Sequence, residues 1–96
     1  MIRHVLLFKF RPSTTDEERR WAVSLLRQLG AIIPDVREWS IGEQLTHSVK
    51  GYTLAQVSAF DDFDALERFR SHPRHIEVRD VFAKIADWIS VDYELE

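Results

Sequence analysis

The residues best suited to proton transfer in this chain are its four histidines. Histidine has an ordinary pKa of about 6.5, so it can take or give a proton near neutral pH. Two of the four stand in the run His72-Pro73-Arg74-His75. His75 is the strongest candidate for acid–base chemistry. The alternative interpretation is structural, with His72 capping a helix, Pro73 beginning it and His75 packing over its first turn.

A second histidine, His4, belongs to an apolar run near the start of the chain and shares a predicted strand face with Leu6 and Phe8. Two interpretations of His4 stay open. It is a core histidine that needs a hydrogen-bond partner, since buried polar groups are nearly always paired. Alternatively, it lines the same cavity as His75.

The sequence gives little support for other kinds of site. The chain has no cysteine, which excludes a thiol nucleophile and a zinc–thiolate centre. The histidines lack the His-Glu-x-x-His spacing of a zinc enzyme, and the three glycines form no phosphate-binding loop. Asp61, Asp62 and Asp64 stand where a helix begins, and capping explains them. We therefore predict no metal and no cofactor.

Length and composition indicate one globular domain over 1–96. Hydrophobic residues make up 45% of the 96 and charged residues 30%, an ordinary balance for a folded domain. The net charge is −3 and the basic residues are scattered, which argues against nucleic acid or an anionic membrane as a partner. No signal-peptide pattern or membrane-length apolar run is seen, so we expect a cytoplasmic location.

Apolar periodicity and turn signals predict the secondary structure. The predicted elements are a strand over 2–10, a helix beginning within 12–18 and ending by Pro34, strands over 36–42 and 52–60 with a polar loop over 43–51 between them, a helix from about 62 to 71, a helical segment beginning at Pro73, and a strand over 88–95. Either Thr14 with Glu17 or Thr15 with Glu18 fits a capping box at the first helix. This order predicts an α+β, ferredoxin-like βαββαβ fold with one four-stranded antiparallel sheet.

The same patterns predict which side chains face the core. The expected buried sets are Trp21, Ala22, Leu25, Leu26, Leu29 and Ile32 on the first helix; Phe63, Leu66 and Phe69 on the second; Val78, Val81, Phe82, Ile85 and Ala86 on the third; and the small residues Thr53, Ala55, Val57 and Ala59 under a helix. Helices on one side leave an apolar sheet face on the other. We expect a second copy of the chain to cover that face.

Four segments, in this order, resemble the stress-responsive A/B-barrel (Dabb) family. They are the opening run from Ile2 to Phe10, Ile33-Pro34-Asp35-Val36, the run from Phe60 to Leu66, and His72-Pro73-Arg74-His75 followed by Val91-Asp92-Tyr93. The resemblance spans essentially the whole chain. It implies a homodimer in which two sheets form an α+β barrel.

The family includes stress-associated plant proteins and a polyketide cyclase that closes an aromatic ring by aldol condensation. The cyclase resemblance places a general base at His75. It also places a catalytic tyrosine three residues before His72, where this chain has Phe69. Phe69 has no hydroxyl with which to orient a substrate.

The resulting hypothesis is a homodimer that binds an apolar or aromatic, polyketide-like molecule, with His75 as catalytic base for cyclase- or lyase-type chemistry. The predicted binding residues are His4, Leu6, Tyr52, Phe69, His72 and Phe82, with Phe63, Leu66, Val78 and Val81 as walls. The alternative is a non-enzymatic, stress-associated structural or interaction dimer. A cavity of roughly 300 Å³ or more beside His75 distinguishes the two.

Overall fold

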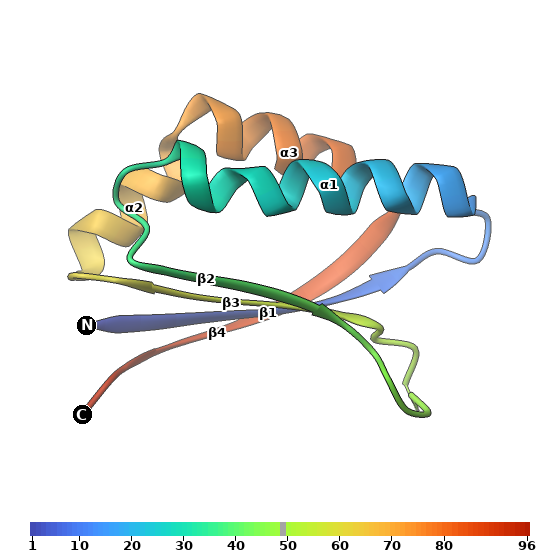
Figure 1. Ribbon diagram of the computed structural model, residues 1–96, viewed down its shortest axis with the longest axis horizontal. Helices are drawn as coiled ribbons and strands as arrows, with labels where there is room; N and C mark the ends of the chain where they lie inside the picture. Colours follow the sequence, from blue (N-terminus) through green and yellow to red (C-terminus); the bar gives the residue numbers. More distant parts are fainter. Residues whose placement is uncertain (49) are drawn as a thin grey trace.

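One antiparallel sheet of four strands carries all the helices on a single face (Figure 1). The structure is a computed structural model that describes residues 1–48 and 50–96. Along the chain the elements are β1 (Ile2–Phe10), α1 (Asp16–Ile32), β2 (Glu38–Glu43), β3 (Leu54–Phe60), α2 (Phe63–Ser71), α3 (Pro73–Ala83) and β4 (Ala86–Glu94). The predicted ferredoxin-like order is confirmed, with the second helix broken into α2 and α3.

The observed bounds differ from the predicted ones mainly at the sheet. β2 and β3 each begin two residues later than predicted, and β4 begins two residues earlier, at Ala86. Val49, within the predicted loop, lies outside the described residues. No helix in the described part of the chain has the length and apolar character needed to cross a membrane.

Local side-chain hydrogen bonds fix where the helices begin. The capping box at α1 uses Thr15 and Glu18, whose backbone N–H donates to Thr15 Oγ1 at 3.0 Å while Thr15 N–H donates to Glu18 Oε1 at 2.9 Å. Asp62 caps α2 by accepting from the Ala65 N–H at 2.8 Å. His72 ends α2 and caps α3, where its Nδ1 accepts from the Arg74 N–H at 3.1 Å.

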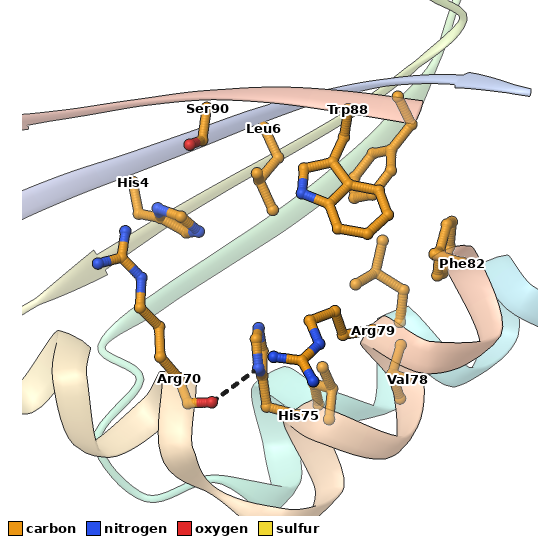
Figure 2. Close-up of a pocket in the computed structure, with 12 residues that line it drawn as sticks. His4, Leu6, Arg70, His75, Val78, Arg79, Phe82, Trp88 and Ser90 are labelled. Atoms are coloured by element: carbon orange, nitrogen blue, oxygen red, sulfur yellow. Dashed lines mark hydrogen bonds between the residues drawn. The ribbon is translucent and has the colours of Figure 1, made fainter. Parts of the chain in front are cut away.

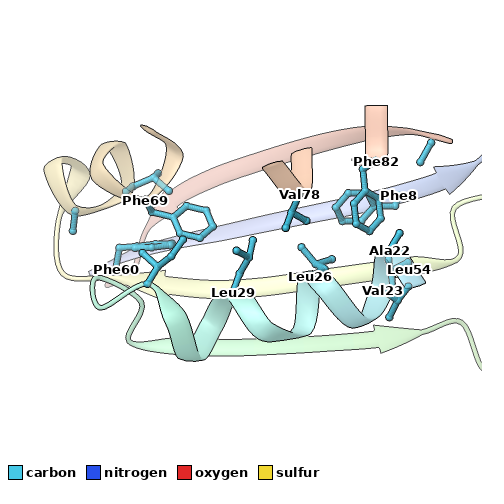
Figure 3. Close-up of a cluster of buried hydrophobic side chains, with 14 residues drawn as sticks. Phe8, Ala22, Val23, Leu26, Leu29, Leu54, Phe60, Phe69, Val78 and Phe82 are labelled. Carbon is cyan, nitrogen blue, oxygen red and sulfur yellow. The ribbon is translucent and has the colours of Figure 1, made fainter. Parts of the chain in front are cut away.

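The strand order β2-β3-β1-β4 makes β1 an inner strand of the sheet, between β3 and β4. Figure 3 shows the buried side chains gathered between the sheet and the helices. The rings of Phe8 and Phe82 lie 4.8 Å apart, and those of Phe60 and Phe69 5.0 Å apart. The core therefore ties β1 to α3 and β3 to α2.

Three of the predicted core positions on the helices are wrong. Trp21 is 56% exposed and Phe63 57% exposed, and Ile32 is also exposed. The buried face of α1 is centred on Ala22, Leu26 and Leu29, so residues at the edge of the predicted apolar stripe turn to solvent. Phe63 is the first residue of α2 and is largely exposed to solvent.

The predicted packing of a helix on the small residues of the third strand is also wrong. Directly paired residues of an antiparallel sheet share a face. Because His4 pairs with Ser58 and Leu6 with Gln56, β3 presents its even-numbered residues to the helices. The small odd-numbered residues, such as Ala55, lie on the opposite face.

That opposite face, which we call the open sheet face, is apolar at its centre. Val5 pairs with Val57 on one side and with Val91 on the other. Leu7 and Ile89 pair in the next row and are both exposed. No element of the described chain covers this face (Figure 1).

The contact between α1 and β2 depends on Gly30. A Cβ added there would lie 2.7 Å from Trp39 Cβ and closer still to Trp39 Cγ.

We expect Gly30→Ala to lower the free energy of unfolding by about 1–3 kcal/mol, the usual cost of overpacking, even though alanine has a higher helix propensity than glycine. Urea unfolding followed by circular dichroism measures this. Gln28→Ala, at an exposed site of the same helix, is the control; a Gly30→Ala variant at least as stable as it would contradict the close packing.

Candidate functional site

A pocket of about 240 Å³ opens between the sheet and α3, with the end of α2 at one side (Figure 2). Its volume falls below the roughly 300 Å³ set above to distinguish a ligand site from a filled interior, so that criterion is not met and only a compact molecule would fit. The residues that line it are His4, Leu6, Phe8, Leu26, Leu29, Arg70, His75, Val78, Arg79, Phe82, Trp88 and Ser90.

The position of His75 is fixed by the break between α2 and α3. Its Nδ1 lies 3.1 Å from the backbone oxygen of Arg70. A carbonyl oxygen can only accept, so Nδ1 carries the proton and Nε2 of the neutral ring keeps a free lone pair. Figure 2 shows this second nitrogen pointing into the pocket toward the sheet. The arrangement is that of a base.

The environment of His75 keeps the imidazole neutral. Its pKa is lowered from 6.5 to about 4. Burial, which penalises the charged form, is the largest cause. The hydrogen bond to the Arg70 carbonyl opposes this shift, and the nearby charges of Arg79, His4 and Arg70 add to it. At neutral pH the pocket therefore holds an unprotonated imidazole.

His4 is held on the other side of the pocket by a carboxylate. It is only 4% exposed, and its Nδ1 donates to Asp92 Oδ1. Asp92 is the residue paired with His4 across β1 and β4. Arg70 Nη2 donates to the other oxygen of the same carboxylate at 2.5 Å. Burial tends to raise the pKa of Asp92, but the hydrogen bonds from His4 and Arg70 and their charges outweigh it and hold that pKa below its usual value.

Both imidazoles thus use Nδ1 for a structural hydrogen bond. Each is left with Nε2 for a further hydrogen bond. Leu6, Phe82 and Trp88 supply apolar walls around them. Among the described residues, no group of three or more acidic or histidine side chains is arranged to hold a metal ion.

The structure brings together four of the predicted site residues and places three elsewhere. His4, Leu6, His75 and Phe82 line the pocket. Phe69 is buried behind it, with its ring 4.6 Å from that of His75 and 6.3 Å from that of His4. Tyr52 and His72 are outside the lining: the ring of Tyr52 lies 5.7 Å from Lys9 Nζ, and His72 caps α3. Of the predicted walls, Val78 lines the pocket and Phe63 is exposed.

Sequence reasoning missed five polar or aromatic lining residues, namely Phe8, Arg70, Arg79, Trp88 and Ser90. Strand alternation places Trp88 and Ser90 on the same face of β4 as Asp92. Arg79 follows His75 by four residues on α3, a spacing that makes two helical side chains neighbours. With His75 as the starting point, these two periodicities could have predicted the lining positions of Arg79, Trp88 and Ser90 from the sequence.

The neutral state of His75 has a measurable consequence. The unfolded histidine binds a proton near pH 6.5 and the folded one near pH 4, so between these values the unfolded chain holds more protons. The free energy of unfolding should therefore fall by about 3 kcal/mol as the pH drops from 6.5 to 4. NMR titration of the ring protons should give a pKa near 4 for His75, and a value near 6.5 would contradict the geometry. His75→Asn should remove most of the fall between pH 6.5 and about 5, above the range in which carboxyl groups of the unfolded chain mainly titrate.

Comparison with known proteins places this fold and pocket in a family. Residues 2–95 match the family described as Stress responsive A/B Barrel Domain. An uncharacterised protein of Streptomyces coelicolor is 36% identical over 96 residues, covering 98% of this chain and 99% of the relative. Olivetolic acid cyclase of Cannabis sativa is 24% identical over 83 residues, covering 84% of this chain and 82% of the cyclase. A dimeric ferredoxin-like protein of unknown function from Thermobifida fusca has a solved structure with a TM-score of 0.87 at 26% identity, covering 98% of this chain and 90% of that one. This chain belongs to the stress-responsive A/B-barrel family.

Proposed function

We propose that this protein binds a compact apolar or aromatic molecule in the pocket and that His75 acts there as a general base, in cyclase- or lyase-type chemistry without a cofactor. The observation that carries the proposal is the neutral His75, whose Nδ1 is bound to the Arg70 carbonyl and whose Nε2 points into the pocket. The likeness to olivetolic acid cyclase agrees with this class of chemistry.

The proposed step is removal of a proton from a carbon next to a carbonyl group. His75 Nε2 takes the proton, and the electron pair moves onto the carbonyl oxygen to form an enolate, which attacks a second carbonyl in an aldol closure. The developing oxyanion needs hydrogen-bond donors. Phe69 supplies none, since it has no hydroxyl. Trp88, with its indole N–H, and Ser90, with its hydroxyl, line the pocket and are donors that can replace the tyrosine of the cyclase resemblance.

We also propose that the protein is a homodimer joined through the open sheet face. The row from Val57 through Val5 to Val91 forms an apolar strip across three strands, and the described chain leaves it uncovered. A self-complementary patch of this kind suits two-fold pairing. The Thermobifida fusca structure of the same fold is described as dimeric.

The non-enzymatic alternative keeps this dimer and gives the pocket no chemical role. The open sheet face favours it as much as it favours the enzyme. The two functions differ in the role of His75. In the non-enzymatic alternative its only role is the hydrogen bond from α3 to the Arg70 carbonyl of α2. A His75 variant therefore separates the two functions.

Charge placed on the open sheet face should break the dimer. Val91 is 62% exposed in the single chain, and Val91→Glu would bury a carboxylate at the centre of the proposed interface. An unpaired buried charge costs several kcal/mol, so we expect the dimer dissociation constant to rise about a hundredfold or more. Sedimentation equilibrium measures it. Phe63→Glu, at a similarly exposed residue on α2, is the control, and equal effects of the two variants would count against this interface.

Loss of the proposed base should remove turnover. Ligands are first identified by NMR with a panel of compact phenols and aromatic β-keto compounds, and those that bind are assayed for ring closure or carbon–carbon cleavage. A general base contributes about 10²- to 10⁴-fold, so His75→Ala should reduce turnover by at least the lower figure. His47→Ala, in an exposed loop, should leave it unchanged. Undiminished turnover in His75→Ala would refute the assignment, and a panel without any binder would favour the non-enzymatic dimer.

A further inference from the structure

The charge of the pocket lining differs in sign from that of the whole chain. The protein carries a net charge of −3, yet the pocket is lined by two arginines and no acidic side chain. Low-dielectric walls such as Phe82 and Trp88 strengthen the field of any charge beside them. Carboxylates beside the pocket pair with Arg70, so the positive charge left at the lining is that of Arg79.

The two arginines are not equivalent. Arg70 is already committed to carboxylates, with one nitrogen 2.5 Å from Asp92 and another 2.9 Å from Glu67. Arg79 has a single ion pair among the described residues, at 3.4 Å to Asp80, its neighbour in the chain. Asp80 accepts from only one nitrogen of the guanidinium, Nη2. A guanidinium has five N–H donors, and most of those on Arg79 are left for a ligand.

The position of Arg79 is at the pocket mouth beside the proposed base. Figure 2 shows its guanidinium alongside the ring of His75. The side chain is 51% exposed, so it is reachable from solvent. Its charge is also the largest charge effect on the pKa of His75, where it opposes protonation of the imidazole. A negative group bound at Arg79 would lie next to the base.

From this geometry we infer that the ligand is a compact aromatic carboxylate, with its ring between Leu6, Phe82 and Trp88 and its carboxylate on the guanidinium of Arg79. The inference rests on the proposed function, because it names the class of molecule that the same pocket takes. The planar fork of arginine matches a carboxylate through two parallel hydrogen bonds. The volume of about 240 Å³ leaves room for a fused two-ring system.

The test compares two probes of the same shape, 2-naphthoate and its neutral isostere 2-naphthamide. Isothermal titration calorimetry gives their dissociation constants for the intact protein and three variants. Arg79→Gln removes the charge and keeps much of the length, and Arg79→Lys keeps the charge without the fork. Arg74→Gln is the control, since Arg74 is an exposed arginine of the same helix that pairs with Glu77 and lies outside the pocket.

We expect naphthoate to bind about tenfold more tightly than naphthamide, the size of a charge-assisted hydrogen bond at a partly exposed site. Arg79→Gln should abolish this preference, Arg79→Lys should keep part of it, and Arg74→Gln should keep all of it. Equal binding of the two probes to the wild type would overturn the inference and leave the aromatic pocket in place. A preference that survives Arg79→Gln would overturn the role of Arg79. Binding of neither probe would refute the aromatic pocket and this inference with it.

Discussion

The break between α2 and α3 is the constraint on which the site depends. Proline cannot donate a backbone hydrogen bond, so α2 cannot continue through Pro73. In an unbroken helix the carbonyl of Arg70 would accept from the N–H of Arg74, but that N–H donates to His72 instead. The Arg70 carbonyl is thereby left for His75, and this one hydrogen bond sets the tautomer and the direction of the imidazole. The helix break at Pro73 thus both ends α2 and orients the imidazole of His75.

The central strand β1 sets the other half of the arrangement. Its pairing with β4 puts Asp92 directly beside His4, and its pairing with β3 decides which face of that strand the helices cover. The same alternation that turns His4 toward the pocket turns Val5 toward the open sheet face. A polar pair in the interior and an apolar strip on the exterior therefore come from consecutive residues of one strand.

The pocket combines features that protein interiors usually keep apart. It has apolar walls, two histidines whose second nitrogens remain available, and arginines at its edge. The partly buried carboxylate of Asp92 is stabilised because both of its oxygens accept hydrogen bonds, one from His4 and one from Arg70. Phe69 packs behind both histidines, at the position where the cyclase resemblance implies a tyrosine, so this site has no hydroxyl there.

The sequence by itself determined the features that depend on neighbouring residues. The order of elements, the capping box at Thr15, the helix break at Pro73 and the alternation along β1 all follow from short-range sterics and hydrogen bonding. The prominence of His4 and His75 followed from residue type and motif.

Tertiary structure alone decided what depends on register and on side-chain packing. It chose the covered face of β3, exposed Trp21 and Phe63, separated Tyr52 and His72 from the pocket, and joined His4 to Asp92 across 88 residues of chain. It also left the cavity open beside His75 and brought Arg79 to its mouth. The physical reason is that a pocket is what remains after distant segments have packed, and its volume depends on a few side-chain rotamers that no local pattern encodes.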